Sequence, residues 1–201
     1  MVAASVLPVS IYKNKLYFLF GKENEFEDSS KGFSDFGGRV DSGEKVMEAA
    51  YREGSEELMG FLGSPSQLKK RIQMSGGTYK INYVCPSPSP SSPSEYLASS
   101  LVSTSVKKPS IKNTYHVNIF FMEYDPNLPI YYNQHYQFIW NHPNMNKREL
   151  NGTKLFEKQE IRWFSIDEMK TNQNLFRGFY VNILNEIISQ RSEILKFIKK
   201  R

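Results

Sequence analysis

Alternating apolar and polar positions predict five strands, over residues 3–12, 15–21, 78–85, 115–124 and 160–164. Side chains of a strand alternate between the two faces of a sheet, so such segments suit half-buried strands. Residues 32–40 predict a further short strand, interrupted at Gly37 and Gly38, because glycine permits unusual backbone angles and close approaches. Residues 130–140 are rich in aromatic side chains and fit either a helix or a strand.

A helical period replaces this alternation over about residues 44–58. Met47, Tyr51, Gly54 and Leu58 share a narrow arc of that helix, which predicts the face that packs on the sheet. Glycine costs an isolated helix about 1 kcal/mol relative to alanine, so Gly54 indicates close packing at this point.

The rest of the chain predicts one domain over residues 1–201, with two additions. The first is a Ser/Pro-rich insertion at about residues 86–113, which suits neither a helix nor a sheet ladder and is expected to be a flexible surface segment. The second is a C-terminal helix over about residues 175–200, predicted from apolar residues at helical spacing.

Composition excludes several classes of protein. Hydrophobic residues make up 39% of the chain and aromatic residues 14%, which is enough for a packed core. The single Cys85 excludes a disulfide framework and fits a reducing compartment, so a cytoplasmic location is expected. The absence of an apolar run of about 18 residues predicts no membrane span. The net charge of +5 favours polyanionic partners such as phosphates, nucleotides or RNA.

The helix over residues 44–58 carries an unusual acidic face. Glu53, Glu56 and Glu57 lie within about 100° of one another around the helix, and like charges at this spacing destabilise it. Carboxylate oxygens on one face are suitable ligands for a hard divalent cation. We therefore expect Mg²⁺ as the cofactor, with Mn²⁺ as its alternative.

A spaced motif surrounds this acidic face. The pattern G-x5-E-x7-R-E-U-x-E-E-x-G-U, in which U is a bulky aliphatic residue, is matched at its spacing by Gly38, Glu44, Arg52, Glu53, Glu56 and Glu57. The sequence therefore resembles the Nudix hydrolases. Two positions depart from that pattern, because Gly54 replaces an aliphatic residue and the closing glycine, Gly60, comes one residue late.

The resemblance implies a fold and an activity. The fold would be an α/β/α sandwich around a mixed sheet, within the α/β class. The enzyme would be a Mg²⁺-dependent pyrophosphohydrolase that cleaves a diphosphate linkage in a nucleoside diphosphate derivative, since cations neutralise phosphate oxygens and activate water.

The same resemblance implies roles for the motif residues. Glu56 and Glu57 would be the principal metal ligands, and Glu53 would complete the metal shell or act on the attacking water. The backbone carbonyl of Gly38 or its neighbour would be a further ligand. Arg52 would hold the carboxylates in place, and Glu44 would add a hydrogen bond.

The general base of such enzymes often lies outside the motif. Glu157 and Glu160 are the candidates because they precede the closing strand, and Glu160 is preferred because its place before the RWF sequence resembles the family pattern. Glu123, at the end of a strand, is held in reserve.

Substrate contacts are expected from aromatic and basic residues near the motif. Phe36 and Trp163 could stack on a base, although isolated aromatic residues more often belong to the core. Arg39 is the expected basic contact.

The variant motif, the insertion and the basic C-terminal tail loosely resemble Nudix proteins of large DNA viruses, some of which remove mRNA caps. Capped RNA is therefore the alternative substrate, and a viral protein would act in the host cytoplasm. A diphosphoinositol substrate is less favoured. A non-catalytic Nudix-fold binding module is the rival from another class, but binding alone does not require the set of three glutamates. The oligomeric state is undefined by the sequence.

Overall fold

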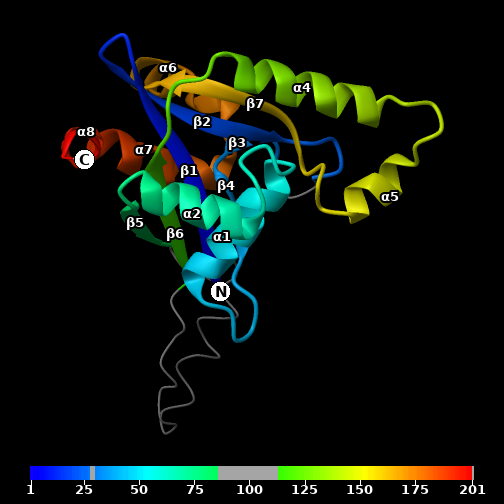
Figure 1. Cartoon of the computed structure of the whole chain (residues 1–201), viewed down its shortest axis with the longest axis horizontal. Helices are drawn as coiled ribbons and strands as arrows, with labels where there is room; N and C mark the ends of the chain where they lie inside the picture. The colour runs from blue at the N-terminus through cyan, green and yellow to red at the C-terminus, as the bar shows by residue number, and fades with distance from the viewer. Residues whose placement is uncertain (28–29, 86–112, 201) are drawn as a thin grey trace, which may run out of the picture.

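A seven-stranded mixed sheet forms the centre of the computed structural model, which describes residues 1–27, 30–85 and 113–200 (Figure 1). The strands are β1 (Val2–Tyr12), β2 (Lys15–Glu23), β3 (Phe33–Ser34), β4 (Phe36–Arg39), β5 (Tyr79–Val84), β6 (Thr114–Phe121) and β7 (Lys158–Ser165). The sheet is mixed because β1 pairs in parallel with β6 and antiparallel with β2 and β4. The predicted Ser/Pro insertion at residues 86–113 lies, except for its last residue, outside the described residues.

The sheet forks between its first two strands. The hairpin of β1 and β2 pairs only from Val9–Tyr12 to Lys15–Phe18, close to its turn. Farther from the turn, β4 pairs with β1 and β3 pairs with β2. Asp35 lies between these two short strands, where the chain crosses from one branch of the fork to the other. The interruption predicted at Gly37 and Gly38 therefore lies at Asp35, and both glycines belong to β4.

Helices cover both faces of the sheet (Figure 1). They are α1 (Val46–Glu57), α2 (Pro65–Met74), α4 (Asn127–Trp140), α5 (Lys147–Gly152), α6 (Ile166–Thr171), α7 (Val181–Ser189) and α8 (Arg191–Lys199). Side chains of α1, α2 and α4 pack on one face, and those of α6, α7 and α8 pack on the other. The predicted α/β class, with a mixed sheet between helices, is confirmed.

Strand alternation explains how two cores form on one sheet. In β1, Ala4 and Val6 pack against the α1 face, whereas Leu7 and Val9 pack against the α7 face, and all four are fully buried. Successive side chains of a strand point to opposite faces, so a strand with both faces buried is nearly continuously apolar. The central strand β1 therefore supports both helical layers.

The C-terminal segment differs from the single helix predicted over residues 175–200. Phe176 has an extended backbone and bridges Phe33 of β3, and Arg177 donates its N–H to the Phe33 carbonyl at 3.1 Å. Two helices follow, separated at Gln190, where ψ is 9°. The apolar spacing continues across this one-residue break, so the sequence pattern could not reveal it.

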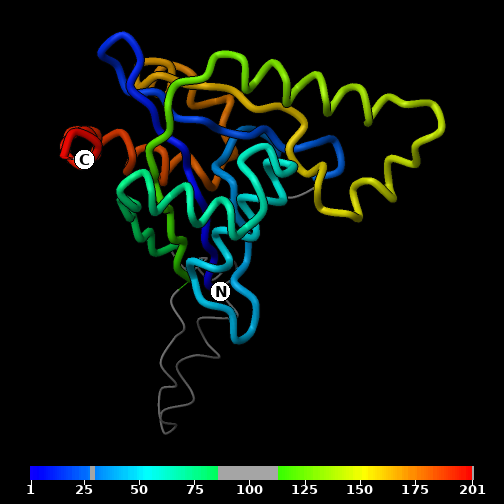
Figure 2. Tube along the Cα trace, in the orientation of Figure 1, coloured from blue at the N-terminus to red at the C-terminus, as the bar shows by residue number. Residues whose placement is uncertain are grey.

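Residues 130–140 belong to helix α4, which resolves the choice between helix and strand. Pro129 lies in the first turn of that helix, where its missing N–H removes no intrahelical hydrogen bond. The helix runs along β7, and the trace in Figure 2 continues beyond the sheet through α5 before it returns to β7. Tyr136, Trp140 and Phe156 form a small separate core beneath this extension.

No helix among the described residues combines the length and apolarity needed to cross a membrane.

The close packing expected at Gly54 is confirmed. A Cβ built on Gly54 would lie 2.4 Å from Cγ2 of Val6 and 3.2 Å from Cδ2 of Leu68. Val6 belongs to the central strand and is fully buried, so it has no space into which to move. The glycine thus lets α1 lie directly on β1.

We expect Gly54→Ala to destabilise the protein despite the higher helix propensity of alanine. Overpacking of a filled core costs typically about 1–3 kcal/mol, and the clash with Val6 should exceed the gain of about 1 kcal/mol in propensity. Urea unfolding measures the change. Gly152→Ala in α5 is the matched control, because nothing lies within 4 Å of its added Cβ and stability should hold or rise. Equal responses of both variants would contradict this account of Gly54.

Candidate active site

Arg52 of α1 joins the loop before the helix to the acidic face. Its Nε donates to Glu44 Oε1 at 3.1 Å and its Nη2 to Glu44 Oε2 at 3.0 Å, which makes a two-point contact. Its Nη1 donates to Glu53 Oε1 at 2.7 Å. The hydrogen bonds from Arg52 are the main reason that the pKa of Glu44 lies below its usual value. Arg52 thus fixes two of the carboxylates that the sequence motif singles out.

Gly38 of β4 lies directly against Glu53. A Cβ at Gly38 would be 2.6 Å from both Cδ and Oε1 of Glu53, so any larger residue would displace that carboxylate. The Glu53 side chain is only 12% exposed, and its burial raises its pKa above the usual value despite the neighbouring Arg52. The strand and the helix therefore enclose this carboxylate between them.

Glu56 is the most exposed carboxylate of the group, with 30% of its side chain accessible. Its Oε2 is 3.5 Å from Arg52 Nη1, an ion pair that is too long for a hydrogen bond. This oxygen is buried and, among the described atoms, has no hydrogen-bond partner. An unsatisfied buried carboxylate oxygen is favourable for binding a cation.

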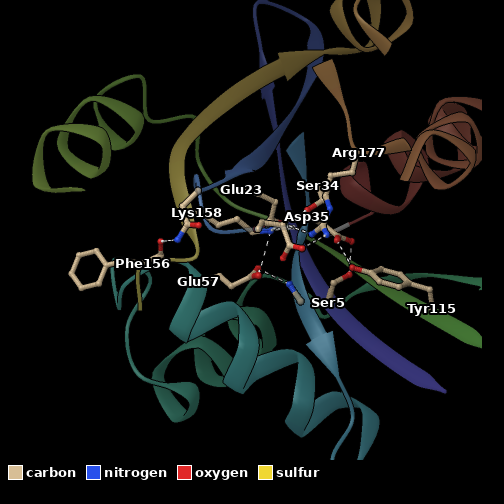
Figure 3. Close-up of polar contacts among 12 residues, drawn as sticks. Ser5, Glu23, Ser34, Asp35, Glu57, Tyr115, Phe156, Lys158 and Arg177 are labelled. Carbon is tan, nitrogen blue, oxygen red and sulfur yellow. Dashed lines mark hydrogen bonds and ion pairs between the residues drawn. The ribbon is translucent and has the colours of Figure 1, made fainter. Parts of the chain in front are cut away.

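Glu57 points into the protein and is 3% exposed (Figure 3). Its Oε2 accepts the N–H of Gly37 at 2.8 Å, and its Oε1 lies 3.3 Å from Nζ of Lys158 on β7. Burial raises the pKa of Glu57 well above its usual value, and the attraction of Lys158 opposes that shift.

Sequence reasoning missed the buried polar residues behind Glu57. Lys158 pairs with Glu23, and Glu23 also pairs with Arg177. In the fork of the sheet, Asp35 accepts hydrogen bonds from Ser5 and from the Tyr115 hydroxyl (Figure 3). These contacts depend on the pairing of β2 with β7 and of β1 with β6, so no local spacing in the sequence could have indicated them.

A cavity of 330 Å³ is bordered by the same glycines. Its lining includes Gly37, Gly38, Arg39, Tyr115, Arg177 and Phe179. Arg177 lies over the ring of Phe179, with Cζ 4.8 Å from the ring centroid. The predicted contact Arg39 therefore faces a space that can hold a ligand.

Phe36 and Trp163, predicted to stack on a substrate base, are placed differently. Phe36 is fully buried, and Trp163 is 6% exposed and donates its Nε1–H to the Asp125 carbonyl at 2.9 Å. Both side chains belong to the core on the face of the sheet that α1, α2 and α4 cover, and neither lines the cavity. The stacking role predicted for them is wrong because their strand positions point inward.

Two solved structures share this arrangement of sheet and helices. The Nudix hydrolase RenU from M. smegmatis is 11% identical, with 96% of this chain and 88% of that chain covered and a TM-score of 0.51. The chain has a Nudix fold. A bifunctional NMN adenylyltransferase/ADP ribose pyrophosphatase from Francisella tularensis, complexed with AMP and a Mn ion, is 13% identical at the same TM-score. The match covers 94% of this chain and 41% of the Francisella chain. No protein-family model matches the sequence, and no curated protein matches it.

The Nudix fold brings one predicted general base to the acidic helix and keeps the others away. Glu157 precedes β7 and is half-buried, and burial raises its pKa, to which the charge of Glu53 also contributes. Glu160 lies opposite Lys22 in the sheet, is 38% exposed and pairs with that lysine at 3.8 Å. Glu123 lines a different groove, beside α2. The geometry therefore favours Glu157 over the preferred Glu160.

The glutamates of α1 suit a divalent cation by their chemistry, although their side chains are not gathered around one point. Among the described residues, no three Asp, Glu, His or Cys side chains are grouped tightly enough to hold one ion. The donor chemistry nevertheless fits. Burial raises the pKa of Glu57, to which the charge of Glu53 also contributes, burial raises the pKa of Glu53, to which the charge of Glu56 also contributes, and Glu56 keeps an oxygen without a donor. Glutamate side chains on one helix face can turn toward a shared ion.

Glu157→Gln should raise the free energy of unfolding at pH 7–8 in the absence of a divalent cation. The raised pKa means that the folded protein binds this proton more tightly than the unfolded chain, whose glutamates titrate near 4.5. The ionised side chain therefore destabilises the fold as the pH rises from 4.5 through the folded pKa. The gain from the substitution should disappear below about pH 4.

Urea unfolding over this pH range checks the expectation. Glu160→Gln is the control, since an exposed ion pair contributes typically only about 0–1 kcal/mol. A pH-independent effect of Glu157→Gln would show that its charge is not disfavoured by burial.

Proposed function

We propose that the chain is a divalent-cation-dependent hydrolase that cleaves a diphosphate linkage in a nucleoside diphosphate derivative. One observation carries this proposal: the two glycines of β4 contact the glutamates of the acidic helix and also line the cavity. Gly37 donates to Glu57, Gly38 abuts Glu53, and both line the cavity. These two glycines therefore connect the cavity with the carboxylates.

Glu53, Glu56 and Glu57 are the residues that would hold Mg²⁺ or Mn²⁺, with the Gly38 carbonyl as a further oxygen. A bound cation supplies neutralisation of phosphate oxygens and a lower pKa for the attacking water. Arg52 orients Glu53 through its hydrogen bond of 2.7 Å, so the carboxylate does not have to be ordered by the ligand. The similar fold of the Francisella protein, whose structure holds a Mn ion, supports this assignment.

Glu157 is proposed as the group that takes the proton from water. A general base works best when its pKa approaches the working pH, and burial moves the pKa of Glu157 upward in that direction. Its place before β7 puts it next to Lys158, and the charge of Glu53 acts on it. Glu160 would then have only a structural role in the pair with Lys22.

The cavity supports a nucleotide-type substrate. Arg39 provides positive charge for a diphosphate, and the ring of Phe179, which is 48% exposed, offers a flat apolar surface for a base. The Francisella protein is described as an ADP ribose pyrophosphatase, which makes ADP-ribose a suitable first substrate to test. Capped RNA is the second candidate, because a cap also contains a nucleoside joined to a phosphate chain. A binding module without activity would leave the three-glutamate set unexplained.

Turnover should require Mg²⁺ or Mn²⁺ and should fall about 100-fold or more in Glu56→Gln. The Glu56 side chain is 30% exposed, and its contact with the partly exposed Arg52 is a long one of 3.5 Å, so the variant should fold normally. Product release is measured by chromatography with ADP-ribose, nucleoside triphosphates and capped RNA as substrates.

Glu48→Gln provides the control, because Glu48 lies on the same helix but pairs with Lys69 on the surface at 3.1 Å. Release of a methylated guanosine diphosphate from capped RNA alone would identify a decapping enzyme. Full activity of Glu56→Gln would contradict the proposed mechanism, and no turnover of any of these substrates by the wild type would favour the binding module.

Phe179→Ala should raise KM for the preferred nucleotide about 10-fold or more with little change in kcat. Loss of a stacking ring removes binding that is shared by the ground state and the transition state. Steady-state kinetics measure both constants. Phe138→Ala on α4 is the matched control, since that ring is 71% exposed and lies outside the cavity. A fall in kcat alone would place Phe179 in a different role.

A further inference from the structure

Lys158 is an unusual neighbour for an acidic metal site. It is 1% exposed and lies behind Glu57, on the side of that carboxylate that faces the sheet (Figure 3). Its Nζ contacts Glu23, lies 3.0 Å from Ser34 Oγ and lies 3.3 Å from Glu57 Oε1. Two of these contacts are hydrogen bonds, to Glu23 and Ser34, and the third is an ion pair with Glu57.

The charges around Lys158 alternate in sign along one buried row. Arg177 pairs with Glu23, Glu23 pairs with Lys158, and Lys158 pairs with Glu57. Two cations thus alternate with two carboxylates along the row, and Arg177 also pairs with Glu27 at 3.7 Å. The row begins at the cavity, which Arg177 and Ser34 line, and ends at the acidic face of α1.

Burying these four charged side chains costs free energy, which is unfavourable if their only role is to stabilise the fold. Buried ion pairs seldom stabilise a fold more than apolar side chains of similar volume would, because removing charges from water is expensive. The ion pair of Lys158 with Glu57, however, lies where Glu57 approaches the other glutamates of α1. A fixed positive charge there reduces the repulsion among those carboxylates before any ion binds.

We propose that Lys158 is a resident cation of the acidic site, which occupies the buried side of Glu57 and restricts a divalent cation to the outer side, toward Glu53 and Glu56. This inference rests on the proposed function, in that it assumes a divalent cation binds to these glutamates. Lys158 acts through Glu57 and is a positioning residue. Two features support the outer side as the place of binding: Glu56 has a buried oxygen without a donor, and the buried side of Glu57 is filled by Lys158 and Gly37.

The consequence can be measured without turnover. If Lys158 repels and restricts the ion, its removal should strengthen Mn²⁺ binding to the full chain, whereas loss of a merely structural contact should leave binding unchanged or weaken it. Titration of Mn²⁺ at pH 8, followed by the free-ion electron paramagnetic resonance signal, gives both the affinity and the number of ions bound.

Three variants separate these outcomes. Lys158→Met removes the charge and keeps an unbranched chain, and we expect Mn²⁺ affinity to rise about 10-fold or more, or one further ion to bind. Glu23→Gln combined with Lys158→Met removes a carboxylate together with the lysine, so it should fold even if the single variant does not, and affinity should rise in the same direction. Lys22→Met is the control, because it removes a lysine from a surface pair with Glu160 and should leave binding unchanged.

Unchanged or weaker Mn²⁺ binding in a folded variant that lacks Lys158 would overturn the proposal while leaving the proposed hydrolase intact. Failure of the wild-type chain to bind Mn²⁺ would overturn both. A rise of equal size in Lys22→Met would show a general effect of net charge, and would also reject the special role of Lys158.

Discussion

The closeness of α1 to the two strands beneath it is the constraint on which the site depends. Gly54 brings the helix onto β1, and Gly37 brings β4 against β1, since a Cβ at residue 37 would lie 2.3 Å from Cβ of Ser5. Gly38 then leaves room for the Glu53 carboxylate. Because these glycines have no side chains, α1, β1 and β4 approach one another closely. This close packing fixes the position of the acidic helix face relative to β4, which lines the cavity.

Much of this could be read from the sequence, and the limits have physical causes. Strand alternation and helix periodicity are local, so β1, β2, β5, β6, β7 and α1 were predicted close to their observed bounds. The motif spacing brought Glu44, Arg52 and Glu53 together because one helix and its preceding loop hold all three. By contrast, Lys158, Glu23 and Arg177 meet only through distant strand pairing, and the buried orientation of Phe36 and Trp163 depends on which face of the forked sheet each one occupies.

Electrostatic interactions determine the properties of the acidic site more than apolar packing does. Burial disfavours the charge on Glu53, Glu57 and Glu157, whereas Arg52 and Lys158 counter it from two directions. Arg52 is partly exposed and forms a two-point contact with Glu44, while Lys158 is enclosed by the sheet. Arg52 and Lys158 therefore offset part of the repulsion among the glutamates, and the repulsion that remains favours binding of a cation.

Both branches of the forked sheet depend on strands that are far apart in the sequence, and this affects how the chain folds. Tyr17 of β2 pairs with Ser165 of β7, and Val2 of β1 pairs with Thr114 of β6, so ladders at the centre join residues far apart in sequence. Such long-range pairing is slow because loop closure must precede it. During synthesis, α1 and its glutamates emerge well before residue 158. The glutamates of α1 are therefore made before their buried lysine, and the pairing of β7 with β2 is the step that brings Lys158 to them.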